Sequence, residues 1–287
     1  MNFLIILLLC ILATSKVTLQ SCFGKKSLKN ASDNILFNAI VFFTAAALFC
    51  NDIHKASFET WLFALAFAIL TVVFQLSYTK ALSIGNVSLT VMSVNLSMLF
   101  PSLVSVIFYN EILSLMRVIG IILTVLSFTL TANLKSKEKL SHSWFILTVM
   151  AALANGGIGI TQKMFGVSSF SDEKKEFVSC SYAIAFLLAL VLYLSMRSRT
   201  KDSKNIKLKI NKTYIFAVAV GLILALFQWL NTYAVSIMDG SFLFPVYSGG
   251  SIILSTLAGI LFFKDKLTKR QKASIILGIT AVVIMNL

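Results

Sequence analysis

The chain has 287 residues, of which 58% are hydrophobic and only 13% charged, and its formal net charge is +14. Soluble domains carry about 25% charged residues, so the composition excludes water as the solvent for most of this surface. The basic residues stand in short clusters between apolar runs rather than along one amphipathic stripe, which favours membrane topology over nucleic-acid binding as their explanation.

Apolar runs follow one another along nearly the whole chain, and each is close to the ~20 residues that cross a bilayer as a helix. Among the polar breaks, only 133–143 and 197–212 are long enough to be free linkers. The sequence therefore predicts an all-α integral membrane protein with ten transmembrane helices. In chain order the predicted spans are 2–21, 34–50, 61–83, 87–108, 114–132, 144–165, 177–196, 213–236, 241–263 and 270–287.

The chain contains an internal duplication. Thr60–Ile84 aligns without a gap to Thr213–Ile237, with ten identities in 25 positions, against roughly three for two unrelated apolar helices. Glu111–Leu130 aligns to Asp265–Ile284, and the pattern Gln-x-x-Phe-Gly recurs. The equivalent positions include Gln20 with Gln162, Phe74 with Phe227, Gln75 with Gln228, and Thr79 with Thr232.

Two homologous five-helix repeats are therefore predicted, 1–132 and 144–287, joined by a linker at 133–143. Because five is an odd number, the second repeat must enter the membrane from the opposite face. The distribution of Lys and Arg between the spans agrees with this inverted arrangement, because 19 of these residues fall on one face of the membrane and four on the other. By the positive-inside rule the 19-charge face is cytoplasmic. Both termini are then expected on the outer side of the cell membrane.

Each predicted repeat has a short fourth-to-fifth connection, Glu111-Ile112-Leu113-Ser114 and Asp265-Lys266-Leu267-Thr268, before its last apolar helix. Those helices contain Gly120-Ile121-Ile122-Leu123 and Ile275-Ile276-Leu277-Gly278. With the two-repeat layout, this resembles the drug/metabolite transporter superfamily, specifically EamA-type carriers. The resemblance implies a transporter whose central cavity opens alternately to each face, with small metabolites, amino acids or drugs as substrates.

Two features depart from the pattern of that family. The proline expected in the fourth helix is kept at Pro101, but in the second half a proline appears earlier, at Pro245. Family members also often have cytoplasmic termini, which the distribution of basic residues argues against here.

Polar side chains within spans are the candidates for a binding site, because they are costly in hydrocarbon and tend to face the bundle interior. With the geometry of the family, they are expected to line one central cavity between the halves. The candidate substrate-binding residues are Lys16, Gln20, Gln75, Tyr78, Asn95, Asn155, Gln162, Gln228, Asn231 and Tyr247.

Each candidate also has a structural interpretation. Lys16 is near the predicted end of its helix and, like Lys163, can extend to the lipid headgroups. Gln75 and Gln228 can be interhelical hydrogen-bonding residues. The tyrosines can be core residues. Small residues of the fifth and tenth helices, at Gly120-x-x-x-Thr124 and Ser274-x-x-x-Gly278, permit close packing or a homodimer interface.

All eleven acidic residues fall in loops or at helix ends. A proton-coupled exporter of cationic drugs ordinarily needs a carboxylate deep in a span, so the sequence favours a neutral, zwitterionic or anionic metabolite. A drug or cation exporter of the same superfamily is the alternative, followed by a non-transporting membrane subunit or a membrane enzyme. The scattered cysteines and two distant histidines predict no metal site and no cofactor, and no enzymatic activity is expected.

Overall fold

The computed structural model describes residues 2–28, 30–85, 87–111, 114–131, 141–199 and 214–263, with 270, 273, 276–278, 280, 281 and 284. Within these residues all regular structure is helical. The elements are α1 (Asn2–Ser27), α2 (Ala31–Ala47), the 3-10 helix η1 (Cys50–Lys55), α3 (Phe58–Ile84), α4 (Val87–Leu96), α5 (Leu99–Tyr109), α6 (Leu115–Thr131), α7 (His142–Gly166), α8 (Lys174–Arg199), α9 (Ile215–Ile237) and α10 (Gly240–Phe263).

Five helical segments are long and apolar enough to cross a membrane: Phe3–Gly24, Phe58–Ile84, His142–Gly166, Lys174–Met196 and Ile215–Ile237. Their outward faces carry large exposed apolar side chains, such as Phe58, Leu153 and Val191. A soluble protein of this size rarely exposes so much contiguous apolar surface, whereas lipid tails accommodate it. The described chain thus has the outer surface of a membrane-embedded bundle.

The first nine predicted spans each correspond to helical structure, and one of them is divided. The span predicted at 87–108 is two helices, α4 and α5, separated at Ser97 and Met98. Pro101 has no N–H to donate to the carbonyl of Ser97, and the amide of Phe100 bonds that oxygen instead, at 3.0 Å. The tenth predicted span, 270–287, lies largely outside the described residues. So do 133–140 of the linker and 200–212 of the break predicted at 197–212, together with the adjoining residues 132 and 213.

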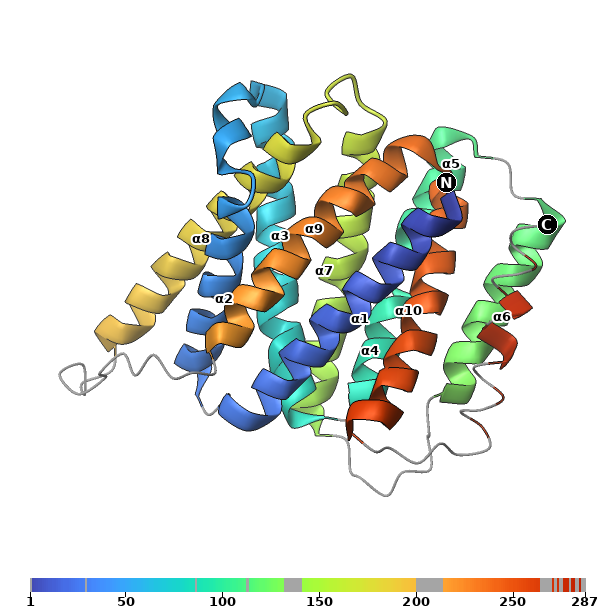
Figure 1. The fold of residues 1–287 in the computed structure, drawn as a ribbon, viewed down its shortest axis with the longest axis horizontal. Helices are drawn as coiled ribbons and strands as arrows, with labels where there is room; N and C mark the ends of the chain where they lie inside the picture. The colour runs from blue at the N-terminus through green and yellow to red at the C-terminus, as the bar shows by residue number, and fades with distance from the viewer. Residues whose placement is uncertain are drawn as a thin grey trace.

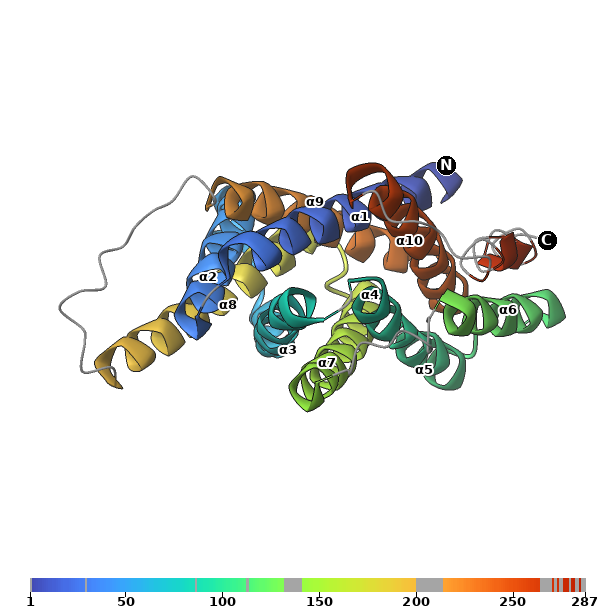
Figure 2. The ribbon, with the colours of Figure 1, turned by 90° about the horizontal axis from the view of Figure 1, so that it is seen from below.

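Helices of the first half pack mainly against helices of the second. α1 contacts α9 and α10, while α7 contacts α3, α4 and α5; α2 contacts α8 and α9, while α8 contacts α2 and α3. Seen from below, α1, α9 and α10 lie on one side, and α3, α7, α4 and α5 on the other (Figure 2). Each pairing has a counterpart when the equivalent helices of the two halves are exchanged.

The helix ends gather at two opposite sides of the bundle (Figure 1). One side, uppermost in the picture, holds η1 and the connections from α7 to α8 and from α9 to α10. The other holds the end of α1, the start of α2 and the start of α7. These two sides are called the η1 end and the α1 C-terminal end below.

Aromatic stacking joins the first helix of each half to the second. The rings of Phe23 in α1 and Phe37 in α2 stack with centroids 3.8 Å apart, and those of Phe165 in α7 and Phe177 in α8 stack at 4.2 Å. Phe23 and Phe165 are equivalent positions of the repeated Gln-x-x-Phe-Gly pattern. All four rings are buried in the same core cluster, so the recurring sequence pattern corresponds to a recurring packing contact.

Candidate functional site

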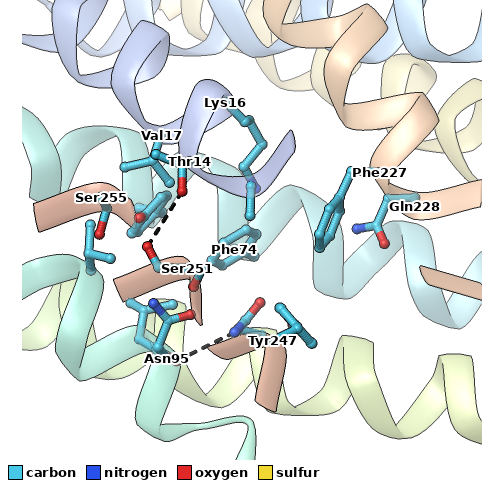
Figure 3. Close-up of a pocket in the computed structure, with 15 residues that line it drawn as sticks. Thr14, Lys16, Val17, Phe74, Asn95, Phe227, Gln228, Tyr247, Ser251 and Ser255 are labelled. Carbon is cyan, nitrogen blue, oxygen red and sulfur yellow. Dashed lines mark hydrogen bonds between the residues drawn. The ribbon is translucent and has the colours of Figure 1, made fainter. Parts of the chain in front are cut away.

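A cavity opens between the two halves, where α1, α3, α4, α7, α9 and α10 converge (Figure 3). Its volume is about 60 Å³, well below the ~300–1,000 Å³ of ordinary small-molecule sites. The space is therefore narrow in this conformation. The lining combines apolar side chains with amides, hydroxyls and one lysine: Ala13, Thr14, Lys16, Val17, Phe74, Tyr78, Val91, Val94, Asn95, Asn155, Phe227, Gln228, Tyr247, Ser251 and Ser255.

Lys16 is the charged residue of this lining. Because α1 continues to Ser27, Lys16 lies in the middle of the helix rather than near its end, and only 7% of it is exposed. Its ammonium lies 5.3 Å from the ring centroid of Phe74 and 5.8 Å from that of Phe227, and its side chain extends toward the space between the two rings (Figure 3). Because Lys16 is in the middle of its helix and is almost fully buried, its side chain does not extend to the lipid headgroups.

The repeated glutamines form the same hydrogen-bonded triad in each half, named here the glutamine triads. In the first, Gln20 Nε2 of α1 donates to Gln75 Oε1 at 3.0 Å and to the hydroxyl of Thr79, both in α3. In the second, Gln162 Nε2 of α7 donates to its equivalents in α9. These acceptors are Gln228 Oε1 at 2.8 Å and Thr232 Oγ1 at 3.1 Å. The triads thus join α1 to α3 and α7 to α9.

The predicted site residues divide between the cavity and the triads beside it. Those that line the cavity are Lys16, Tyr78, Asn95, Asn155, Gln228 and Tyr247. Gln20, Gln75 and Gln162 belong to the triads and do not line the cavity. Asn231 does not line it either, and its side-chain amide donates to Gln162 Oε1 at 2.8 Å. Gln228 alone does both, so the two equivalent glutamines of α3 and α9 have different surroundings.

Several lining side chains already have partners. Tyr247 donates its hydroxyl to the sulfur of Met98 at 3.0 Å, and Asn155 donates to Ser97 Oγ at 3.1 Å, at the break between α4 and α5. Tyr78 stacks on Phe74 with centroids 5.1 Å apart. These contacts fix the orientations of the cavity wall.

The lining also contains residues that were not among the ten candidates, and the two phenylalanines Phe74 and Phe227 are the most informative of them. Polarity within a span does not single out a phenylalanine, because such a residue is ordinarily lipid-facing or part of the core. A signal was present, because both belong to the repeated segment and each directly precedes a glutamine of the triads. If two repeats are related by an axis through a central cavity, equivalent residues face that cavity from both sides. An aromatic residue kept at equivalent positions of both repeats is therefore a candidate lining residue.

A buried ion pair closes the η1 end of the bundle beside the cavity helices. Lys163 Nζ of α7 lies 2.7 Å from Glu111 Oε1 in the connection after α5, and their side chains are only 5% and 7% exposed. The expectation that Lys163 extends to the headgroups is therefore wrong. Glu111 also accepts the backbone N–H groups of Gly240 and Ser241, at 2.9 and 2.8 Å, at the N-terminus of α10, where a carboxylate is favoured.

These contacts alter the titration of Glu111, which lies outside the spans. Burial raises the pKa of its carboxyl, but the hydrogen bonds from Lys163, Ser241 and Gly240 outweigh burial and hold the pKa below its ordinary value. The carboxylate is therefore ionised at neutral pH. It links α7, α10 and the end of α5 through one charged group.

The first half of the chain is similar to a known family. Residues 4–133 match the EamA-like transporter family. The resemblance to the drug/metabolite transporter superfamily is thereby confirmed, and with the apolar helices it supports a membrane-embedded, multi-pass transporter. No curated protein matches the chain.

A solved crystal structure of a protein shares the fold, with a TM-score of 0.75 over 99% of this chain and 95% of that chain. Sequence identity to that protein is 12%, so this likeness concerns the fold alone.

Proposed function

We propose that this protein carries a small metabolite across a membrane by alternating access to the cavity between its two halves. The observation that carries the proposal is the position of the cavity, which is bounded by α1, α3 and α4 of the first half and by α7, α9 and α10 of the second. Rocking of one repeat against the other opens such a midplane cavity to either face. A cavity of about 60 Å³ must widen during that movement to admit a metabolite.

The architecture belonging to this proposal is two inverted five-helix repeats, 1–132 and 144–287, with ten transmembrane helices in total. It is supported by the reciprocal pairings of α1 with α9 and α7 with α3. It is also supported by the glutamine triads, which repeat the same bonds in both halves. The proposed location is the cell membrane, with both termini outside, on the basis of the 19 and four basic residues assigned to the two faces.

The proposed substrates are amino acids or related neutral, zwitterionic or anionic solutes, bound by residues among the ten candidates. Among the residues that the structure describes, the cavity lining includes Lys16 and no carboxylate, and the acidic residues lie in connections or first helical turns. A drug or cation exporter is the less suitable alternative, because a cation would meet a like charge. Besides the solute and the bilayer, a second copy of the chain is the proposed partner, through the fifth or tenth span.

Purified protein in proteoliposomes tests the proposal with a panel of labelled amino acids and organic acids, with and without a pH gradient. Val94→Trp fills the cavity that Val94 lines, whereas Val191→Trp adds the same ring on an exposed face of α8. We expect uptake by the wild type and by Val191→Trp, and its loss in Val94→Trp. Equal uptake by both variants would show that the cavity is not the pathway, and no uptake of any solute by the wild type would reject the transporter itself.

A further inference from the structure

We propose that Lys16 is the charge-recognition residue of the cavity and that the transported solute carries an anionic oxyacid group, a carboxylate or a phosphate, that pairs with it. This inference rests on the proposed function and narrows its substrate class. It excludes cations and makes purely neutral solutes poor substrates.

The Lys16 ammonium is buried without a counter-charge among the described residues. A buried cation is costly unless it is paired and hydrogen-bonded, and intramembrane charges normally have an identifiable partner. Lys16 makes no hydrogen bond or ion pair with any residue that the structure describes, although it is only 7% exposed. A solute anion would supply the missing counter-charge.

Two aromatic rings flank the Lys16 ammonium. The faces of Phe74 and Phe227 lie 5.3 and 5.8 Å from it, and a cation over an aromatic face is stabilised, though less than by a carboxylate. The rings compensate the charge in part and leave its remaining donors for a ligand. They also form low-dielectric walls, in which attraction between the ammonium and an anion is stronger than in water.

The charge of Lys16 is present in only one of the two repeats. Phe74 and Phe227 are equivalent residues of the two repeats, so the ring pair has a member from each half. Lys16 has no such counterpart, because it stands four residues before Gln20, whereas Ile158 stands four residues before Gln162. A symmetric pair of rings therefore holds a single cation, which predicts one anionic group per cavity.

The rest of the lining suits the uncharged part of such a solute. Thr14, Ser251 and Asn95 place hydroxyls and an amide around the same space (Figure 3). Asn155 also lines it. Neutral donors and acceptors of this kind bind hydroxyl, amino or carbonyl groups without requiring a second charge. The arrangement fits a small organic acid or phosphate ester that is polar beyond its anionic group.

The test is the thermal unfolding of purified full-length protein in detergent, at constant ionic strength, with solutes matched in size. The probes are propionate, propionamide and propylamine, together with lactate, methyl phosphate and inorganic phosphate. The variants are Lys16→Met, which removes the charge, Lys16→Arg, which keeps it, and Lys55→Met, which removes an exposed lysine at η1.

We expect at least one anion to raise the Tm of the wild type, of Lys16→Arg and of Lys55→Met, with no shift from propionamide or propylamine. In Lys16→Met the apparent affinity for that anion should fall at least ~10-fold, because a charged hydrogen bond is lost. Without solute, Lys16→Met should unfold at the same temperature as the wild type or higher, since an unpaired buried charge has been removed.

An anion shift that persists in Lys16→Met, a wild type stabilised by no anion, or stabilisation by propionamide or propylamine alone would each overturn the inference. Its failure is distinguishable from failure of the proposed function. Lys16→Met proteoliposomes that take up the same solutes as the wild type would reject the role of Lys16 and leave transport standing. Anion binding that depends on Lys16, without uptake of any solute, would support the role of Lys16 and reject transport.

Discussion

The two halves of the bundle are alike in their glutamine triads and different in their buried lysines. Gln20 and Gln162 make the same bonds to equivalent glutamines and threonines. The buried cations have no such equivalence. Lys16 corresponds to Ile158, and Lys163, which directly follows Gln162, corresponds to Ser21, which directly follows Gln20.

This difference separates residues that stabilise helix packing in both halves from residues that make the two halves unequal. A bond that both copies retain stabilises the packing of two helices wherever that packing recurs. A charge that only one copy carries makes the two ends and the two walls of the cavity unequal. Among the described helix ends, the buried ion pair of Lys163 with Glu111 lies at the η1 end and has no equivalent at the α1 C-terminal end. The charge of Lys16 is on the cavity wall formed by α1.

The largest expected effect comes from breaking the asymmetric ion pair. Glu111→Gln leaves Lys163 buried without a counter-charge and weakens the cap of α10, so we expect a loss of about 3–5 kcal/mol in the free energy of unfolding. Asp239→Asn is the matched control, because its partner Arg117 and Asp239 itself are much more exposed, at 26% and 50%, and such pairs contribute about 1 kcal/mol or less. Denaturant unfolding in detergent measures both, and equal losses would contradict the structural importance of the buried pair.

The same pair predicts a dependence on pH. The carboxyl of Glu111 has a pKa below its ordinary value in the folded protein. Its contribution is therefore complete above the unfolded pKa of about 4.3 and is lost as the pH falls through the lower, folded value. Between pH 7 and pH 3 the wild type should lose more stability than Glu111→Gln. Parallel curves for the two proteins would show that another group controls acid unfolding.

A smaller effect distinguishes the two glutamine triads. Gln75→Leu and Gln228→Leu each remove an acceptor for an interhelical bond, and such bonds contribute about 0.6–2 kcal/mol, so both variants should unfold at slightly lower temperature. Because Gln228 lines the cavity and Gln75 does not, only Gln228→Leu should also weaken solute binding. Thermal unfolding with and without transported solute measures both quantities. Equal losses of affinity would place both glutamines in the binding site.

Much of this arrangement could be predicted from the sequence, because long apolar runs and an internal repeat are local or periodic signals. The alignment paired Gln20 with Gln162 and Gln75 with Gln228, and these residues form equivalent contacts. The division of the fourth span could also have been anticipated from Pro101 within it.

The rest depends on tertiary proximity that no local pattern encodes. Glu111 and Lys163 are far apart in sequence and meet only because α5 packs against α7. The same is true of Lys16, whose surroundings are set by rings from α3 and α9. A lysine near a predicted helix end has the same sequence pattern whether it reaches the headgroups or the cavity.

Alternating access is tested most directly by thiol labelling of one cavity residue from each side of the membrane. Ser251 lines the cavity, and Ser251→Cys is made in a background that lacks the four native cysteines. Ser171→Cys and His142→Cys report on the η1 end and on the α1 C-terminal end. With an impermeant reagent applied to either face of oriented vesicles, the two end positions should each react from one side only, Ser171→Cys from outside and His142→Cys from the cytoplasmic side. Alternating access predicts that Ser251→Cys reacts from both sides, and reaction from a single side, with transported solute present or absent, would contradict it.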